Sequence, residues 1–169
     1  MFVGHAALAL FAKTRRPRIA VAVLVPVAFG PDWVQWVLEL FNRNNRELSH
    51  SLPAVFAYAL AAAVAYRVVA RAPLADAATV ALLWISHWPA DFITGTKPTW
   101  PGGPNVGLLL YEHPFSDIAV ESAMTVLCWL AYRAMLPAER RNAGVVWTML
   151  AGLIAMQCAF SYIQGPMTS

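Results

Sequence analysis

The sequence predicts an all-α protein, a polytopic membrane bundle of about five transmembrane helices with a short N-terminal half-helix, in one integral membrane domain over residues 1–169. Hydrophobic residues make up 59% of the chain and charged residues only 12%, whereas soluble domains carry roughly 25% charged residues. The apolar residues also gather in runs of about 20, the length that a helix needs to cross a bilayer. The net charge of +3 is therefore interpreted through the ends of these runs, and no nucleic-acid partner is expected.

The first two apolar segments differ in length. Phe2–Ala12 is too short to cross a hydrocarbon core of about 30 Å at about 1.5 Å per residue, so a half-helix or an interfacial helix is expected. Ile19–Phe41 is long enough to span, but Pro26 and Gly30-Pro31 predict a kink or break in its middle. Asp32 follows this break directly, in the first turn of a new helix, where a carboxylate suits the helix dipole.

Four further segments are expected to span the membrane, namely Leu52–Ala70, Leu74–Thr94, Ile118–Leu136 and Val145–Ile163. In the second of these, Pro89 predicts a bend between His87 and Asp91. The connection Gly95–Asp117 carries four prolines and four glycines, and a loop of this length is either disordered or functional.

The basic residues are distributed unevenly between the two ends of the expected spans. One end receives nine of them: Lys13, Arg15, Arg16, Arg18, Arg67, Arg71, Arg133, Arg140 and Arg141. The other end receives three, Arg43, Arg46 and Lys97. The positive-inside rule places the first set in the cytoplasm.

A histidine and a carboxylate lie four residues apart in the stretch Ser86-His87-Trp88-Pro89-Ala90-Asp91, so they share one face of a helix. Ionisable groups in such an apolar segment cost several kcal/mol unless they are paired, hydrated or bound to a metal. His5, Asp32 and His50 also lie within or at the edge of apolar segments, and the topology places them in or near the outer half of the bilayer. We expect the set His5, Asp32, His50, His87 and Asp91 to converge on one metal site.

Three imidazoles and two carboxylates are the ligand set of a divalent metal, most naturally zinc. Five ligands exceed the four of a closed zinc site, so one or two ions are expected, with Asp91 as the bridging carboxylate. Glu121 and His113 are the catalytic candidates, and Glu112 and Asp117 are further possible ligands or bases. The three outer basic residues could hold an anionic head group.

Several stretches resemble the bacterial membrane-bound metal-dependent hydrolases related to the LexA-regulated, inner-membrane YdjM type. They are MFVGHAALALFAK at the start, ELSHSL around His50, SHWPADFITG around His87, and WPGGPNVGLLLY in the long connection. This resemblance implies a multi-span protein of the bacterial inner membrane with a divalent-metal site.

The order His, Asp, His and then His-x-x-x-Asp is also similar to the metal-ligand order of the zinc-dependent phospholipase C and P1 nuclease class. His5, Asp32, His50, His87 and Asp91 match that order. That class has a further His and a His-x-x-x-Glu pair, whereas His113 and Glu121 have a different spacing. One or two metal ions are therefore expected rather than three.

The resulting hypothesis is a metal-dependent hydrolase that attacks an ester or phosphoester, such as a phospholipid or lipid-linked substrate, at the outer leaflet of the bilayer. The first alternative is a protein that moves a proton or a metal ion across the membrane, since ionisable residues within the membrane are also the signature of transport. The second alternative is a non-enzymatic membrane protein with a structural metal site. A protein that passes an ion across the membrane needs polar groups at several depths of the bilayer. The cytoplasmic halves of the expected spans have few polar groups, which favours a site on one side of the membrane and therefore the hydrolase.

Overall fold

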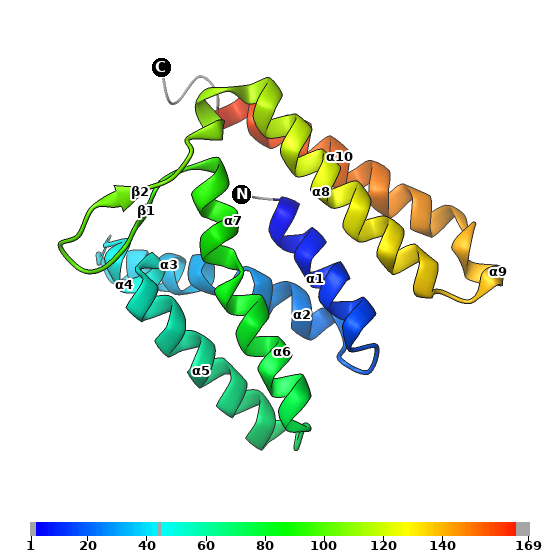
Figure 1. Cartoon of the computed structure of the whole chain (residues 1–169), viewed down its shortest axis with the longest axis horizontal. Helices are drawn as coiled ribbons and strands as arrows, with labels where there is room; N and C mark the ends of the chain where they lie inside the picture. Colours follow the sequence, from blue (N-terminus) through cyan, green and yellow to red (C-terminus); the bar gives the residue numbers. More distant parts are fainter. Residues whose placement is uncertain (1–2, 44, 165–169) are drawn as a thin grey trace.

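The computed structural model describes residues 3–43 and 45–164, and nearly all of its regular structure is helical, as the sequence predicts (Figure 1). The elements in chain order are α1 Val3–Arg15, α2 Val21–Ala28, α3 Gly30–Leu40, α4 Glu47–His50, α5 Leu52–Val69, α6 Leu74–Ile85, α7 His87–Thr94, β1 Lys97–Pro98, β2 Asn105–Val106, the 3₁₀ turn η1 Leu110–Glu112, α8 Pro114–Met135, α9 Ala138–Arg141 and α10 Gly144–Gln164. The expected first segment begins at Phe2, which lies outside the described residues.

Three helices of the described chain are long and apolar enough to cross a membrane: α5, α8 and α10. The pair α2 and α3 would make a fourth span if the two count as one, but they are bent by 63° at the break between them. The expected five spans are therefore not confirmed. Large apolar side chains on the surfaces of the three long helices, such as Leu60, Leu127 and Ile163, are exposed, as lipid contact would require.

The break between α2 and α3 lies where Gly30-Pro31 predicts it. Pro26 lies inside α2, and Gly30 and Pro31 begin α3. Gly30 is needed for close packing, because a Cβ at this position would lie 2.3 Å from the ring of Trp84. Asp32 falls in the first turn of α3, as expected.

The segment Leu74–Thr94 is interrupted at Ser86, which ends α6 and precedes α7. The predicted bend between His87 and Asp91 is wrong, because both residues lie in the same helix, α7. The physical reason is that a proline disturbs the turn before it: it removes the hydrogen bond to the carbonyl four residues earlier and clashes with that carbonyl. The interruption therefore precedes His87, and the four-residue spacing of His87 and Asp91 is preserved.

The basic connections gather at one end of the bundle. Figure 1 shows the α1–α2, α5–α6 and α8–α10 connections toward the lower right, whereas the β1–β2 hairpin lies at the opposite end. Within the basic end, Asp76 is 2% exposed and pairs with Arg18 at 2.8 Å and with Arg16 at 3.8 Å. The grouping of basic residues in the sequence thus matches a grouping in space.

The connection 95–113 is ordered and packs over α4 and α7. Strand β1 pairs with β2 in antiparallel register, Lys97 opposite Val106. The hairpin is tied to the helices by hydrogen bonds from the N–H of Leu52 to the carbonyl of Thr99 (3.0 Å) and from the N–H of Leu108 to the carbonyl of Phe92 (2.7 Å). These contacts bring Lys97 next to the end of α7.

Candidate metal centre

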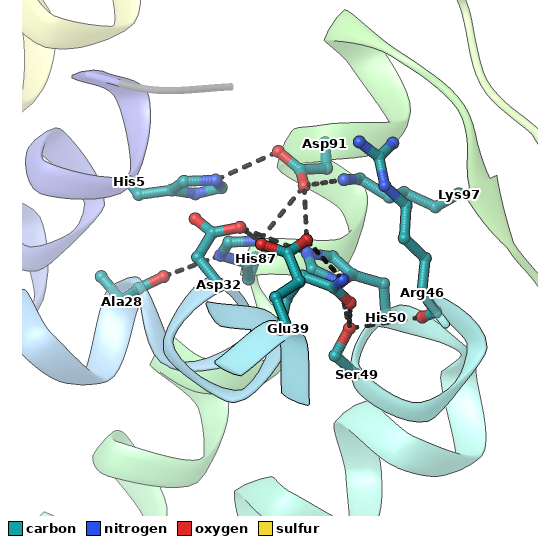
Figure 2. A network of polar contacts seen from close by, with 11 residues as sticks. His5, Ala28, Asp32, Glu39, Arg46, Ser49, His50, His87, Asp91 and Lys97 are labelled. Atoms are coloured by element: carbon teal, nitrogen blue, oxygen red, sulfur yellow. Dashed lines mark hydrogen bonds and ion pairs between the residues drawn. The ribbon is translucent and has the colours of Figure 1, made fainter. Parts of the chain in front are cut away.

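Four side chains from three helices converge on one point (Figure 2). Asp32 comes from the first turn of α3, His50 from the end of α4, and His87 and Asp91 from α7. One donor atom of each residue lies within 4.8 Å of a donor atom of every other. The three residues on α4 and α7 are buried, whereas the side chain of Asp32 is 48% exposed. The structure thus brings together four of the five residues expected to share a metal site.

The distances among these donors fit one small metal ion. Nε2 of His50 lies 3.3 Å from Oδ1 of Asp32 and 3.9 Å from Oδ2 of Asp91. Nε2 of His87 lies 3.6 Å and 3.2 Å from the same two oxygens. A tetrahedral zinc site with bonds of about 2.0–2.2 Å holds its donors roughly 3.3–3.6 Å apart. Three of these four distances are close to that spacing, whereas the fourth is 3.9 Å and the four donors as a set lie within 4.8 Å of one another, so a bound ion would draw the donors closer together.

The ring of His87 is oriented by the broken helix behind it. Its Nδ1 lies 2.9 Å from the carbonyl oxygen of Ala28, and because a carbonyl only accepts, Nδ1 must carry the proton. Ala28 is the last residue of α2, and the last carbonyls of a helix have no partner within it. The break between α2 and α3 thus supplies the acceptor that turns Nε2 of His87 toward the cluster.

The ring of His50 is oriented by a chain of polar side chains. Oγ of Ser49 lies 2.7 Å from Nδ1 of His50 and donates its own hydrogen to Oε1 of Gln35, also at 2.7 Å. The amide of Gln35 donates in turn to Oε1 of Glu39 at 2.8 Å. Because the hydroxyl hydrogen of Ser49 goes to Gln35, its oxygen accepts from Nδ1–H of His50, and Nε2 is left to bind a metal.

The protonation of His50 also suits metal binding. Burial lowers the pKa of this imidazole below the ordinary histidine value. The neutral ring, which is the form that binds a metal, is therefore favoured at neutral pH.

The four donors form a group that could hold a cation. With Nδ1 protonated on both histidines, two ring nitrogens and two carboxylate oxygens face one another as acceptors. Nε2 of His87 is buried, and the groups that face it include the carboxylate oxygens of Asp91 at 3.2 Å and of Asp32 at 3.6 Å. Such a group of acceptors is unfavourable unless a proton or a metal ion lies between them, and two imidazoles with two carboxylates suit a divalent metal such as zinc.

The two oxygens of Asp91 face different groups. Oδ2 faces the two histidines of the cluster and lies 2.6 Å from Nζ of Lys97, whereas Oδ1 lies 3.1 Å from Nε2 of His5. The ring of His5 stacks on that of His87 with centroids 3.8 Å apart. Figure 2 shows His5 and Lys97 on opposite sides of the carboxylate. This two-sided arrangement is compatible with a bridging role for Asp91, with His5 as the ligand on its second side.

The two catalytic candidates lie outside the four-donor cluster. Glu121 is buried in α8, and its Oε2 accepts a hydrogen bond from the N–H of Gly4 at 3.0 Å. This contact holds the first turn of α1, one residue before His5, where a carboxylate also suits the helix dipole. His113 is exposed and precedes α8.

The other acidic candidates also have separate surroundings. Asp117 is buried against α10, where its Oδ2 accepts hydrogen bonds from Ser161 at 2.5 Å and from Gln157 at 3.1 Å. Glu112 lines a cavity of about 660 Å³ that also borders the donors Asp32 and Asp91. Asp117 therefore joins α8 to α10, while Glu112 remains near the donors.

A cavity of about 660 Å³ adjoins the donor cluster, and we call it the head cavity. Asp32 and Asp91 form part of its wall, and Arg46, Lys97 and Glu112 are its other charged residues. Aromatic side chains complete much of the lining. A ligand in this cavity would contact both the carboxylate donors and two basic side chains.

Sequence reasoning missed the groups that orient the histidines, namely Gln35, Ser49 and the carbonyl of Ala28. One signal was available, because Asp32, Gln35 and Glu39 are spaced by three and four residues and so share one face of α3. The contact of His87 with Ala28 had no comparable signal, because it joins residues 59 positions apart.

Comparison of the chain with models of protein families, with curated proteins and with solved structures finds no match. The resemblance to the YdjM-type hydrolases remains a prediction from sequence motifs.

Proposed function

We propose that this protein is a membrane-bound, metal-dependent hydrolase of esters or phosphoesters. The observation that carries the proposal is that four donors lie within 4.8 Å of one another, and that two of them, Asp32 and Asp91, line the head cavity. The side chain of Asp32 is half exposed and lines the cavity, so water in the cavity can reach an ion at the cluster as a further ligand, and catalytic zinc accepts a fifth ligand.

Two groups of residues have separate roles in this proposal: one group binds the metal, and the other binds the substrate. His50, His87, Asp32 and Asp91 would hold the ion, and a divalent cation there would act as a Lewis acid toward water and toward an ester oxygen. Arg46 lines the same cavity and would attract an anionic group of the substrate.

The membrane location of this activity is part of the proposal. We infer that the protein lies in the bacterial inner membrane with the donor cluster toward the outer face, where an ester of a membrane lipid would be within reach. The support is the set of nine basic residues at the end of the bundle opposite the hairpin, which the positive-inside rule assigns to the cytoplasm.

The first test is the metal content of the detergent-purified protein after chelation and reloading with zinc. We expect wild-type protein to retain about one or two ions per chain, and His87→Ala and Asp91→Ala to lose most of them. His113→Ala is the matched control, because it removes an exposed imidazole outside the cluster. Equal metal in wild type and both donor variants would refute the metal site.

The second test is turnover by the loaded protein of bis(p-nitrophenyl) phosphate, p-nitrophenyl butyrate and phosphatidylglycerol vesicles. We expect at least one substrate to be hydrolysed, and the rate to fall with metal content in the donor variants. Bound metal with no turnover of any of these substrates would reject the hydrolase proposal while leaving the metal site intact.

A further inference from the structure

A second cavity, of about 550 Å³, lies between α2, α3, α5 and α6. Its lining is apolar or aromatic apart from the backbone, with Val34 and Val37 from α3, Tyr58 from α5 and Trp84 from α6. We call it the chain cavity. No charged residue contributes to this lining, so it suits a hydrocarbon chain and not a polar ligand.

The two cavities share a wall. Trp33 lines both the head cavity and the chain cavity, and it directly follows Asp32, one of the four metal donors. A ligand that extends from one cavity to the other would therefore have its polar end at the donor cluster and its apolar end beyond Trp33.

The chain cavity is a product of the break between α2 and α3. The two helices diverge by 63°, and Pro26, Val27 and Gly30 line the cavity at that point. The ring of Trp84 reaches this wall because Gly30 has no Cβ, which would lie 2.3 Å from the ring. One backbone feature thus positions Asp32 for the metal and opens the apolar space beside it.

The charge of the head cavity depends on the metal. Its lining holds two basic residues, Arg46 and Lys97, and three acidic ones, Asp32, Asp91 and Glu112, so the formal sum is 2 − 3 = −1. A divalent cation changes this sum to +1. An anionic head group is therefore favoured only when the metal is present.

We propose that the two cavities are the head-group and acyl-chain subsites for one ligand, an anionic phospholipid. This inference deepens the proposed function and rests on it for the chemistry at the head group. Two observations support this occupant: the two cavities are neighbours that share Trp33 as a lining residue, and the head cavity holds the basic residues Arg46 and Lys97. Lipid reaches the chain cavity laterally, since α2 and α3 together form the bent candidate span.

The test uses the full chain in detergent, loaded with zinc, and a phosphatidic acid with a photoreactive diazirine at mid-chain. After illumination, we expect cross-links on the peptide of α3 that contains Val34 and Val37. Val34→Trp fills the chain cavity and should reduce these cross-links about tenfold, which corresponds to ~1.4 kcal/mol. Leu40→Trp is the matched control, because Leu40 is 64% exposed on the same helix and lines neither cavity.

Further experiments distinguish the contribution of the head group to binding from that of the acyl chain, and distinguish a lipid ligand from free phosphate. A diacylglycerol with the same diazirine chain should label α3 weakly, and chelation should weaken labelling by the phosphatidic acid. An excess of inorganic phosphate should compete only partly, because it lacks the chain.

Labelling spread evenly over α5, α8 and α10, or unchanged in Val34→Trp, would overturn the inference and indicate annular lipid. That result would not contradict the proposed hydrolase activity, because the protein could still hydrolyse a soluble ester in the turnover assay. Conversely, labelling of the chain cavity without turnover would support the lipid-binding site and contradict the proposed hydrolase activity.

Discussion

Nζ of Lys97 lies 2.6 Å from Oδ2 of Asp91, the same oxygen that faces Nε2 of His87 at 3.2 Å. The ammonium group therefore neutralises a carboxylate that a metal ion would also bind. Lys97 is held in this place by the β1–β2 hairpin, which the backbone hydrogen bonds of Thr99 and Leu108 attach to the helices. Metal and ammonium compete for one oxygen.

This competition gives the first prediction. Lys97→Met removes the competing charge while keeping an unbranched side chain, so we expect zinc affinity to rise by about tenfold, or ~1.4 kcal/mol. Isothermal titration of the chelated protein with zinc measures this change. Arg46→Met is the control, because it removes the same charge from the same cavity. Affinity that is equal or lower in Lys97→Met would mean that Lys97 supports the metal instead of competing with it.

The second prediction concerns the hydrogen-bond chain behind His50. Ser49→Ala removes the acceptor of Nδ1–H, so the ring loses its fixed orientation, and zinc affinity should fall by roughly 10–100-fold. Ser86→Ala is the control, because Ser86 precedes His87 but its hydroxyl donates to the carbonyl of Leu83 in the preceding helix, α6. Equal zinc affinity of the two variants would exclude a role for Ser49 in orienting the ring of His50.

The third prediction separates two roles of Glu121. In Glu121→Gln the amide oxygen still accepts from the N–H of Gly4, so the melting temperature should stay close to that of wild type. Glu121→Ala leaves that N–H without this acceptor and should lower stability by about 1–3 kcal/mol. If Glu121 is instead a general base, the Gln variant keeps its metal and its stability but loses turnover. Thermal unfolding, metal analysis and the ester assay on both variants decide between these roles.

The fourth prediction concerns orientation. In a background with Cys128→Ser and Cys158→Ser, Asn105→Cys in the hairpin should react with a membrane-impermeant maleimide at the outer face of the inner membrane. Glu139→Cys in α9 should react only after the membrane is opened, because α9 lies at the basic end. Both native positions 105 and 139 are exposed, so access to solvent within the fold is matched. The reverse labelling pattern would invert the proposed topology.

The sequence was most informative where a single residue type has one physical consequence. Gly30-Pro31 predicted the break between α2 and α3, and the spacing of His87 and Asp91 predicted two donors on one helix face. The cost of ionisable groups in apolar segments singled out Asp32 and His50 as well. These arguments need only local geometry and solvation, which the sequence specifies.

Other features depend on how distant segments pack, which one sequence does not specify. The bend assigned between His87 and Asp91 lies before His87, because the effect of Pro89 falls on the preceding turn. The expected five spans are not confirmed, and one of them, Leu74–Thr94, is divided at Ser86 into two shorter helices. The acceptors of the two histidines, Ala28 and Ser49, were missed because only the folded arrangement places them behind the rings.

The positions of the donors along the chain set the order in which they are synthesised. The four converging donors fall between residues 32 and 91, and α8 and α10 contribute none of them. During synthesis from the N-terminus, the complete ligand set is therefore available before two of the three long spans have left the ribosome. Under the proposed function, metal binding would thus need no residue of α8 or α10, whereas the contact of Glu121 with Gly4 can form only once α8 has been made.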